Sequence, residues 1–262
     1  MKVNIKSKYY DYKLAIWDIR FNVHPGTMAL VVGTSGVGKT TLIKCLLNDT
    51  DYEGNVQYDD GEGKGGIGYI RQHPGFNESE TVYQALMFAG FYSNPYAEVS
   101  EIRNQAVTLL SSLGIAGVAN RKIRQLSGGQ RQRVAIGREM MRKTKTLLMD
   151  EPFSALDPAT ARTLVRDLAD VVHTQKRTAI IVSHNLNDLK YFDRLLVLAK
   201  DSNQEFVGRV AYFGEAAASS KYFGTSDLTD VMIKLNSKKE REKYIQTMMK
   251  IGPEGWKSTR AS

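Results

Sequence analysis

The 262-residue chain has little of what secreted or membrane-embedded proteins require. It contains one cysteine, Cys45, so no internal disulfide can form, and a reducing compartment is expected. No apolar run approaches the roughly 20 residues that a membrane-spanning helix needs. Residues 1–12 are polar and aromatic and lack the pattern of a signal peptide. We therefore expect a protein that is soluble by itself.

Acidic residues are in the minority, and the net charge of +8 predicts an anionic partner. Residues 121–145 carry nine basic side chains and a single acid, Glu139. Contact with nucleic acid is one interpretation of this stretch. The other, which we favour, is a solvated helix face beside a phosphate site or a membrane surface. Nucleic acid is accordingly not expected as a partner.

A glycine-rich segment follows a predicted buried strand of five apolar residues, 28–32, and precedes a predicted helix. Its glycines allow a tight turn in which successive N–H groups point at an anion, and the helix N-terminus adds positive charge. Lys39 can reach β- and γ-phosphates, and the Thr40 hydroxyl can ligate Mg²⁺. The segment is predicted to be a phosphate-binding loop formed by Gly33, Thr34, Ser35, Gly36, Val37, Gly38, Lys39, Thr40 and Thr41.

A second apolar strand, predicted at 146–150, ends in two acids. Carboxylates at the carboxyl edge of a sheet lie where open α/β folds bind ligands. Asp150 suits the shell of a Mg²⁺ ion, and Glu151 can polarise an attacking water. The alternative is a strand end with two solvated acids. His184 follows another β-branched strand at 178–182 and can donate to a γ-phosphate, although such a histidine can also be structural.

Two helix starts carry further candidate ligands. Ser127 is a suitable N-cap, and Gly128, Gly129 and Gln130 after it leave backbone N–H groups open to an anion. An ordinary loop would have the same sequence. Asp157 is likewise predicted to cap a helix, with Pro158 at its first position.

Aromatic residues gather before the first buried strand, at Tyr9, Tyr10, Tyr12 and Trp17. An adenine ring can stack on such a side chain. Ordinary surface positions on a β-sheet account for at least two of the four.

The chain is predicted to be α/β, with β segments first and helical apolar spacing after Pro74 and Gly75. The predicted units are one domain at 1–235, made of a nucleotide-binding core (1–74 and 144–235) and a helical subdomain (75–143), and an exposed charged helix with a loose tail at 236–262.

These motifs, in this order, resemble those of the ATP-binding-cassette (ABC) ATPases over about residues 1–215. Segment 33–40 is similar to the family's Walker A loop, and 147–150 to the end of Walker B, with Glu151 at the catalytic glutamate. Segment 126–130 matches the signature motif, and 154–157 the D-loop.

Three single residues also match the family. Gln72 lies at the Q-loop position, and the resemblance implies that it is catalytic. The resemblance also implies that Gln72, Thr40 and Asp150 contact Mg²⁺. His184 lies at the switch histidine, and Tyr10 at the adenine-stacking aromatic. The resemblance implies a P-loop NTPase with a RecA-like mixed-sheet core, an N-terminal antiparallel β subdomain and an inserted helical subdomain.

The resemblance also implies how such a protein works. Two copies face head to tail, and each ATP lies between the Walker A loop of one copy and the signature of the other. Ser127 and Gly129 would contact a γ-phosphate held by Lys39 of a second copy. The implied catalytic residues are Glu151, His184, Gln72 and Lys39.

The C-terminal part gives weaker signals. Segments 209–214, 222–224 and 227–235 look like the end of the cassettes in the G-subfamily of lipid and pigment exporters and in related bacterial exporters. In contrast, 126–133 and 154–158 resemble importer-type and general bacterial cassettes. Import and export therefore both stay open from the sequence.

We expect an ATP-hydrolysing subunit of an ABC transporter, on the cytoplasmic face of a membrane and bound to a separate membrane-spanning permease. The alternative from another class is a soluble ABC ATPase that acts on nucleic acid, ribosomes or an assembly scaffold. The members of that class that act as translation factors usually carry two cassettes in one chain, whereas this chain has one.

Overall fold

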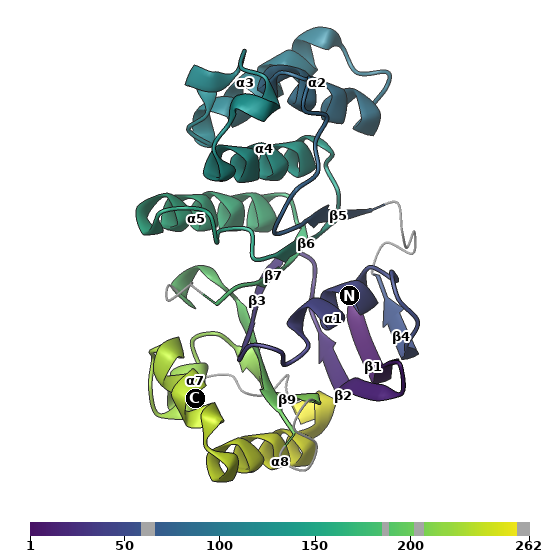
Figure 1. The fold of residues 1–262 in the computed structure, drawn as a ribbon, viewed down its shortest axis with the longest axis vertical. Helices are drawn as coiled ribbons and strands as arrows, with labels where there is room; N and C mark the ends of the chain where they lie inside the picture. Colours follow the sequence, from purple (N-terminus) through teal and green to yellow (C-terminus); the bar gives the residue numbers. More distant parts are fainter. Residues whose placement is uncertain (59–65, 185–188, 202–206, 256–262) are drawn as a thin grey trace.

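The computed structural model describes residues 1–58, 66–184, 189–201 and 207–255. They form a long molecule built on one curled sheet, with helices gathered at both ends of the molecule (Figure 1). The strands are β1 (Lys2–Tyr10), β2 (Lys13–Asn22), β3 (Thr27–Gly33), β4 (Glu53–Gln57), β5 (Ile67–Ile70), β6 (Thr146–Asp150), β7 (Thr178–Val182), β8 (Arg194–Lys200) and β9 (Gly208–Glu215). The helices are α1 (Lys39–Leu46), α2 (Val82–Ser93), α3 (Val99–Ser112), α4 (Gly128–Met141), α5 (Pro158–Thr174), α6 (Ser219–Phe223), α7 (Leu228–Asn236) and α8 (Lys238–Gly255), with short 3₁₀ turns at Ala116–Val118, Ile123–Gln125 and Leu189–Tyr191.

The sheet has the strand order β4-β1-β2-β9-β8-β3-β7-β6-β5. Strands β8, β3, β7, β6 and β5 are parallel neighbours, whereas β4, β1 and β2 pair antiparallel. The central strands β3, β6 and β7 are buried throughout, apart from the half-buried Thr27 at the start of β3, as continuous apolar runs in parallel sheets require. The predicted mixed sheet with an N-terminal antiparallel part is therefore confirmed.

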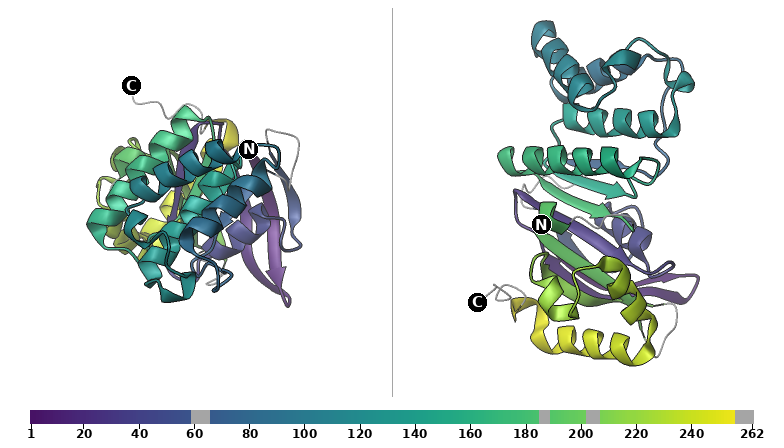
Figure 2. Two further views of the ribbon diagram at one scale, coloured as in Figure 1. Left: turned by 90° about the horizontal axis from the view of Figure 1, so that it is seen from above. Right: turned by 90° about the vertical axis from the view of Figure 1, so that its left-hand side faces the viewer.

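Helices α2, α3 and α4 pack together as a separate layer at one end of the molecule (Figure 2, right). The chain leaves the sheet after β5 and returns to it at β6. Helix α4 contacts β5 directly, and α5 packs against β3 beside this layer (Figure 1). Because β3, β7 and β6 are parallel neighbours, their carboxyl ends lie together at one edge of the sheet.

The C-terminal helices lie at the other end of the molecule and pack against β8 and β9. The predicted charged helix after residue 236 is present as α8, but it is exposed on one side only, because it buries Tyr244, Ile245 and Met248 and packs against β9. Tyr244 joins an aromatic cluster with Tyr222 and Phe223, at ring-centroid distances of 5.4 and 4.9 Å. The predicted tail beyond residue 255 lies outside the described residues.

Cys45 is buried in α1, as expected for a small core side chain, and burial raises the pKa of its thiol to about 11. In the described ranges, no helix combines the length and the apolar character that crossing a membrane takes.

Candidate functional site

The glycine-rich loop joins β3 to α1, as predicted. Gly38 has a φ of 94°, in the left-handed region that favours glycine, and a Cβ there would lie 2.4 Å from Cγ2 of Ile16. The Nζ atom of Lys39 donates to the carbonyls of Gly33 (2.8 Å) and Thr34 (3.2 Å). An ammonium has three N–H donors, so these contacts orient Lys39 and leave one donor for a phosphate.

The loop rests on a residue that the sequence analysis missed, Gly208 at the start of β9. Its backbone lies so close to the loop that a Cβ would stand 1.9 Å from the carbonyl oxygen of Val37. Gly208 also forms the parallel pair with Ile16 that joins β9 to β2. A glycine that opens a β-strand is a weak signal, and nothing in the sequence indicates that Gly208 touches a loop about 170 residues earlier.

A cavity of about 820 Å³ lies over the loop. The residues predicted to be catalytic meet there, although they come from separate segments: Lys39, Gln72, Glu151 and His184. Most of the predicted phosphate-binding residues line the same space, together with three residues that were not predicted. The full lining is Ala15, Gly33, Thr34, Ser35, Gly36, Gly38, Lys39, Thr40, Thr41, Gln72, Asp150, Glu151, His184, Met232 and Asn236.

The charged residues that line this cavity influence one another's pKa values. Burial lowers the pKa of Lys39 below its ordinary value, while the nearby carboxylates of Glu151 and Asp150 oppose that shift. Burial raises the pKa of Asp150, and the hydrogen bond from Thr40 opposes the rise. The Thr40 hydroxyl and the Asp150 carboxylate are therefore adjacent. Hard oxygen donors of this kind suit Mg²⁺, which takes few protein ligands and completes its shell with phosphates and water.

Glu151 adopts an unusual backbone conformation, with a φ of 51°. Non-glycine residues in this region are strained and gather at functional sites. The Glu151 N–H donates to the carbonyl of Val182 (2.9 Å), and the Ser154 hydroxyl donates to the Glu151 carbonyl (3.0 Å). Nδ1 of His184 lies 2.6 Å from Oε1 of Glu151, so the ends of β6 and β7 are joined by their side chains.

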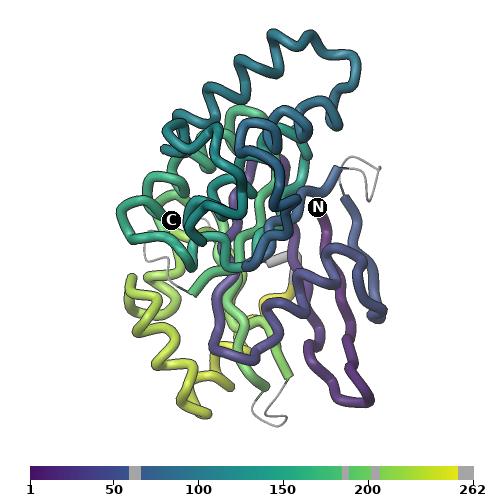
Figure 3. Tube along the Cα trace, turned by 45° about the horizontal axis from the view of Figure 1, so that its top comes forward, coloured from purple at the N-terminus to yellow at the C-terminus, as the bar shows by residue number. Residues whose placement is uncertain are grey.

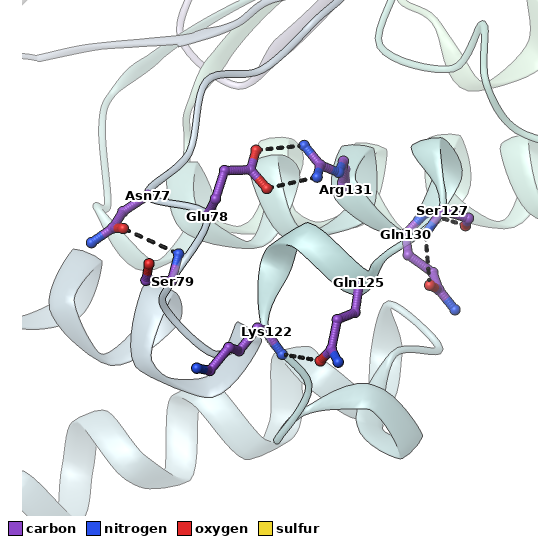
Figure 4. Close-up of polar contacts among 8 residues, drawn as sticks. All are labelled: Asn77, Glu78, Ser79, Lys122, Gln125, Ser127, Gln130 and Arg131. Carbon is purple, nitrogen blue, oxygen red and sulfur yellow. Dashed lines mark hydrogen bonds and ion pairs between the residues drawn. The ribbon is translucent and has the colours of Figure 1, made fainter.

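Ser127 caps α4 as predicted, and its partner completes a reciprocal capping box. The Ser127 Oγ accepts from the Gln130 N–H (3.3 Å), and Oε1 of Gln130 accepts from the Ser127 N–H (3.1 Å; Figure 4). A Cβ on Gly129 would lie 3.0 Å from the Ala155 carbonyl oxygen, so the signature packs against the D-loop. Asp157 caps α5 by accepting from the Thr160 N–H (3.0 Å).

An ion pair holds the segment after Gln72 against the first turn of α4. Glu78 makes two hydrogen bonds of 2.7 Å with the guanidinium of Arg131 (Figure 4). The Glu78 carbonyl also accepts from the Arg124 N–H (3.3 Å). Fork-to-fork pairs of this kind fix orientation as well as distance.

Some predicted site residues do not meet the others. Ser127, Gly128, Gly129, Gln130 and Asp157 are not part of the cavity lining of their own chain. Tyr10 does not line it either. The Tyr10 ring is partly exposed and lies under Nζ of Lys8, 4.3 Å from the ring centroid.

Comparison with known proteins identifies the class. The family model described as "ABC transporter" matches residues 16–154. A phosphonates import ATP-binding protein of Alcaligenes faecalis is 31% identical over 255 residues, with 87% of this chain and 89% of the relative covered. An aliphatic sulfonates import ATP-binding protein of Burkholderia cenocepacia is 36% identical over 206 residues, covering 76% and 73%.

Solved structures agree in fold. An ATP-binding subunit of an ABC transporter superposes with a TM-score of 0.76 at 21% identity, covering 90% of this chain and 99% of that one. A dimeric ATP-binding cassette bound to ADP and phosphate gives a TM-score of 0.67 at 23% identity, covering 82% and 97%.

The chain belongs to the ABC transporter family. It is an ATP-binding and ATP-hydrolysing subunit of such a transporter. The resemblance of its C-terminal part to the G-subfamily stays a prediction.

Proposed function

We propose that this cavity hydrolyses ATP with Glu151 as the residue that polarises the attacking water. The observation that carries the proposal is that Lys39, Gln72, Glu151 and His184 line one cavity. Lys39 would hold the β- and γ-phosphates together with the N–H groups of the loop. His184 orients the Glu151 carboxylate through their hydrogen bond and contacts the γ-phosphate.

Mg²⁺ is the second part of the proposal. Thr40, Asp150 and Gln72 supply oxygen donors on the cavity wall. The bound ion would neutralise phosphate charge. No group of three or more His, Cys, Asp or Glu side chains that could hold a metal occurs in the described part of the chain. A site with one carboxylate, completed by ATP, fits this donor set.

The remaining predicted ligands act on a second copy in this proposal. Ser127 and Gly129 begin α4 outside their own cavity, with N–H groups and a hydroxyl at a helix N-terminus that favours anions. In a head-to-tail dimer they meet the γ-phosphate that the other copy holds, with Gly128, Gln130 and Asp157 beside them. ATP then joins the two copies, and hydrolysis releases them. Tyr10 stacks on the adenine ring at the opposite end of the nucleotide.

The helical layer, proposed to span 75–143, receives the membrane-spanning partner. A groove of about 670 Å³ lies between α2 and the segment after Gln72. Its walls include the exposed aromatic rings of Phe88 and Tyr92 and the guanidinium groups of Arg138 and Arg142. Exposed aromatic and arginine side chains are typical of binding hot spots. The nucleotide-binding core comprises 1–74 and 144–235.

The names of the relatives support a proposal for the direction of transport. Their names describe import ATP-binding proteins for phosphonates and aliphatic sulfonates. We propose import for this chain as well, with the subunit on the cytoplasmic face of the membrane.

Mixing two inactive variants tests the head-to-tail arrangement. Lys39→Ala disables one cavity but leaves its signature intact, whereas Ser127→Asp places a repelling charge in the signature and leaves the cavity intact. Together they form dimers with one complete site, so ATP turnover should return on mixing. Turnover that stays absent in the mixture, while each variant still folds, contradicts the shared site.

A further inference from the structure

Helix α7 contributes to the wall of the ATP cavity, although it lies beyond every motif of the site. Met232 and Asn236 line the same space as Lys39, Glu151 and His184. Met232 is partly buried, and Asn236 is exposed at the end of the helix. No hydrogen bond joins the Asn236 carboxamide to any residue in the described ranges, so its polar atoms are available to a ligand.

The helix is held firmly at this position. Asp227 caps its N-terminus by accepting from the Thr229 N–H (2.7 Å), and Leu228, Val231 and Leu235 form its buried face. Nζ of Lys234 donates to the carbonyl of Phe223 (2.6 Å), which belongs to the aromatic cluster under α8. The last turn is thus fixed by the buried Leu235 and by the hydrogen bond of Lys234.

The chemistry of that turn is compatible with an anion. The C-terminus of a helix carries partial negative charge, which would repel phosphate. Here the guanidinium of Arg241 offsets that charge, because its Nη1 donates to the Leu235 carbonyl (3.3 Å). The carboxamide N–H₂ of Asn236 supplies two donors and no net charge.

The position of α7 indicates which end of the nucleotide it meets. In Figures 1 and 3, α7 lies on one side of the loop between β3 and α1, and β1 and β2 lie on the other. Ala15 of β2 lines the cavity on the second side, where the adenine is proposed to stack. Helix α7 therefore stands at the γ-phosphate end.

We infer that Asn236 donates a hydrogen bond to the γ-phosphate and so favours ATP over ADP, with Met232 packed beside it. This inference rests on the proposed triphosphate site. It makes the C-terminal helix part of nucleotide selection in this chain.

Binding of ATP and ADP to the purified full chain tests the inference by calorimetry. Asn236→Asp keeps the size of the side chain but adds a negative charge, so ATP affinity should fall at least about tenfold. Asn236→Ala should weaken ATP by a smaller factor, and ADP should change less than about twofold in both variants. Thr229→Asp adds the same charge at the other end of α7, away from the cavity, and should leave both affinities unchanged.

The outcomes separate this inference from the proposal beneath it. Unchanged ATP affinity in Asn236→Asp, or an equal loss for ATP and ADP, overturns the γ-phosphate contact. Normal ATP affinity in Lys39→Ala, measured alongside, instead overturns the assignment of the cavity itself.

Discussion

Oε1 of Glu151 and Nδ1 of His184 lie 2.6 Å apart, although the two residues are 33 positions apart in the chain. The other carboxylate oxygen of Glu151, Oε2, is buried and has no hydrogen-bond partner among the described residues. An orphaned buried acceptor at the wall of a phosphate cavity is costly unless a ligand or water completes it. Oε2 is therefore the atom that we assign to the attacking water.

Glu151→Gln should bind ATP and fail to hydrolyse it. The amide keeps the size of the side chain but cannot accept a proton, and a lost general base costs about 10² to 10⁴ in rate. Because the γ-phosphate persists, the ATP-bound dimer should accumulate. Phosphate release and size-exclusion chromatography with ATP measure both effects. Hydrolysis at the wild-type rate would remove Glu151 from the catalytic role.

The affinity for ATP should depend on pH through Lys39. Burial lowers the pKa of its ammonium below the ordinary 10.5, so the charge that attracts phosphate is lost at a lower pH than for a free lysine. ATP affinity should therefore fall as the pH rises towards the ordinary pKa of lysine, before a free lysine would lose its charge. Lys39→Arg serves as the control, because an arginine stays charged over this range. The ATP affinity of this variant should therefore change less with pH than that of the wild type. A wild-type affinity that does not change up to the ordinary pKa of lysine contradicts the prediction.

Local sequence predicted most of the site, because each motif is a strand end or a helix start that its own neighbours define. Ser127 and Asp157 cap helices as expected. What it could not predict are contacts between distant segments: Gly208 under the loop, and Asn236 beside the cavity. A glycine and an asparagine fit many surface positions, and only the packing of β9 and α7 gives them a role.

The basic stretch 121–145 is a second case in which contacts between distant segments could not be predicted from local sequence. We interpreted it as a solvated face, but Gln132 and Glu139 on α4 are buried. The apolar residues of α4 are widely spaced in the sequence, so their pattern does not show that polar residues of this helix are also buried by neighbouring elements. It lies between α2 and the sheet, so both of its sides are in contact with other elements.

Gly208→Ala should disturb the phosphate-binding loop. The new methyl group would stand 1.9 Å from the Val37 carbonyl oxygen, so the loop or β9 must move. We expect ATP affinity to fall at least about tenfold, equivalent to about 1.4 kcal/mol. Gly117→Ala is the matched control, because a Cβ there meets no atom within 4 Å. Urea unfolding of both variants separates a displaced loop from a failure to fold, and unchanged ATP binding in a folded Gly208→Ala would contradict the role of this contact.

Glu139→Gln should raise the stability of the protein at neutral pH. Only Oε1 of Glu139 is paired, at 3.3 Å from Nη1 of Arg142, and Oε2 is buried without a hydrogen-bond partner among the described residues. Burial raises the pKa of Glu139 above its ordinary value, and the nearby charge of Arg142 reduces this rise without cancelling it. The folded state then binds more protons than the unfolded state between the two pKa values. The free energy of unfolding therefore falls as the pH rises through the folded pKa.

The glutamine variant lacks this titration. We expect it to gain about 1 kcal/mol at pH ~7.5, and to differ little from the wild type below the ordinary pKa of glutamate, where both states are protonated. Urea unfolding at the two pH values measures the difference. Glu101→Gln is the control. Glu101 is exposed, and its Oε1 lies 3.7 Å from Nζ of Lys143 at the surface, where an ion pair contributes little to stability. A Glu139→Gln variant that is less stable at neutral pH would mean that the bond to Arg142 outweighs the cost of burying the charge.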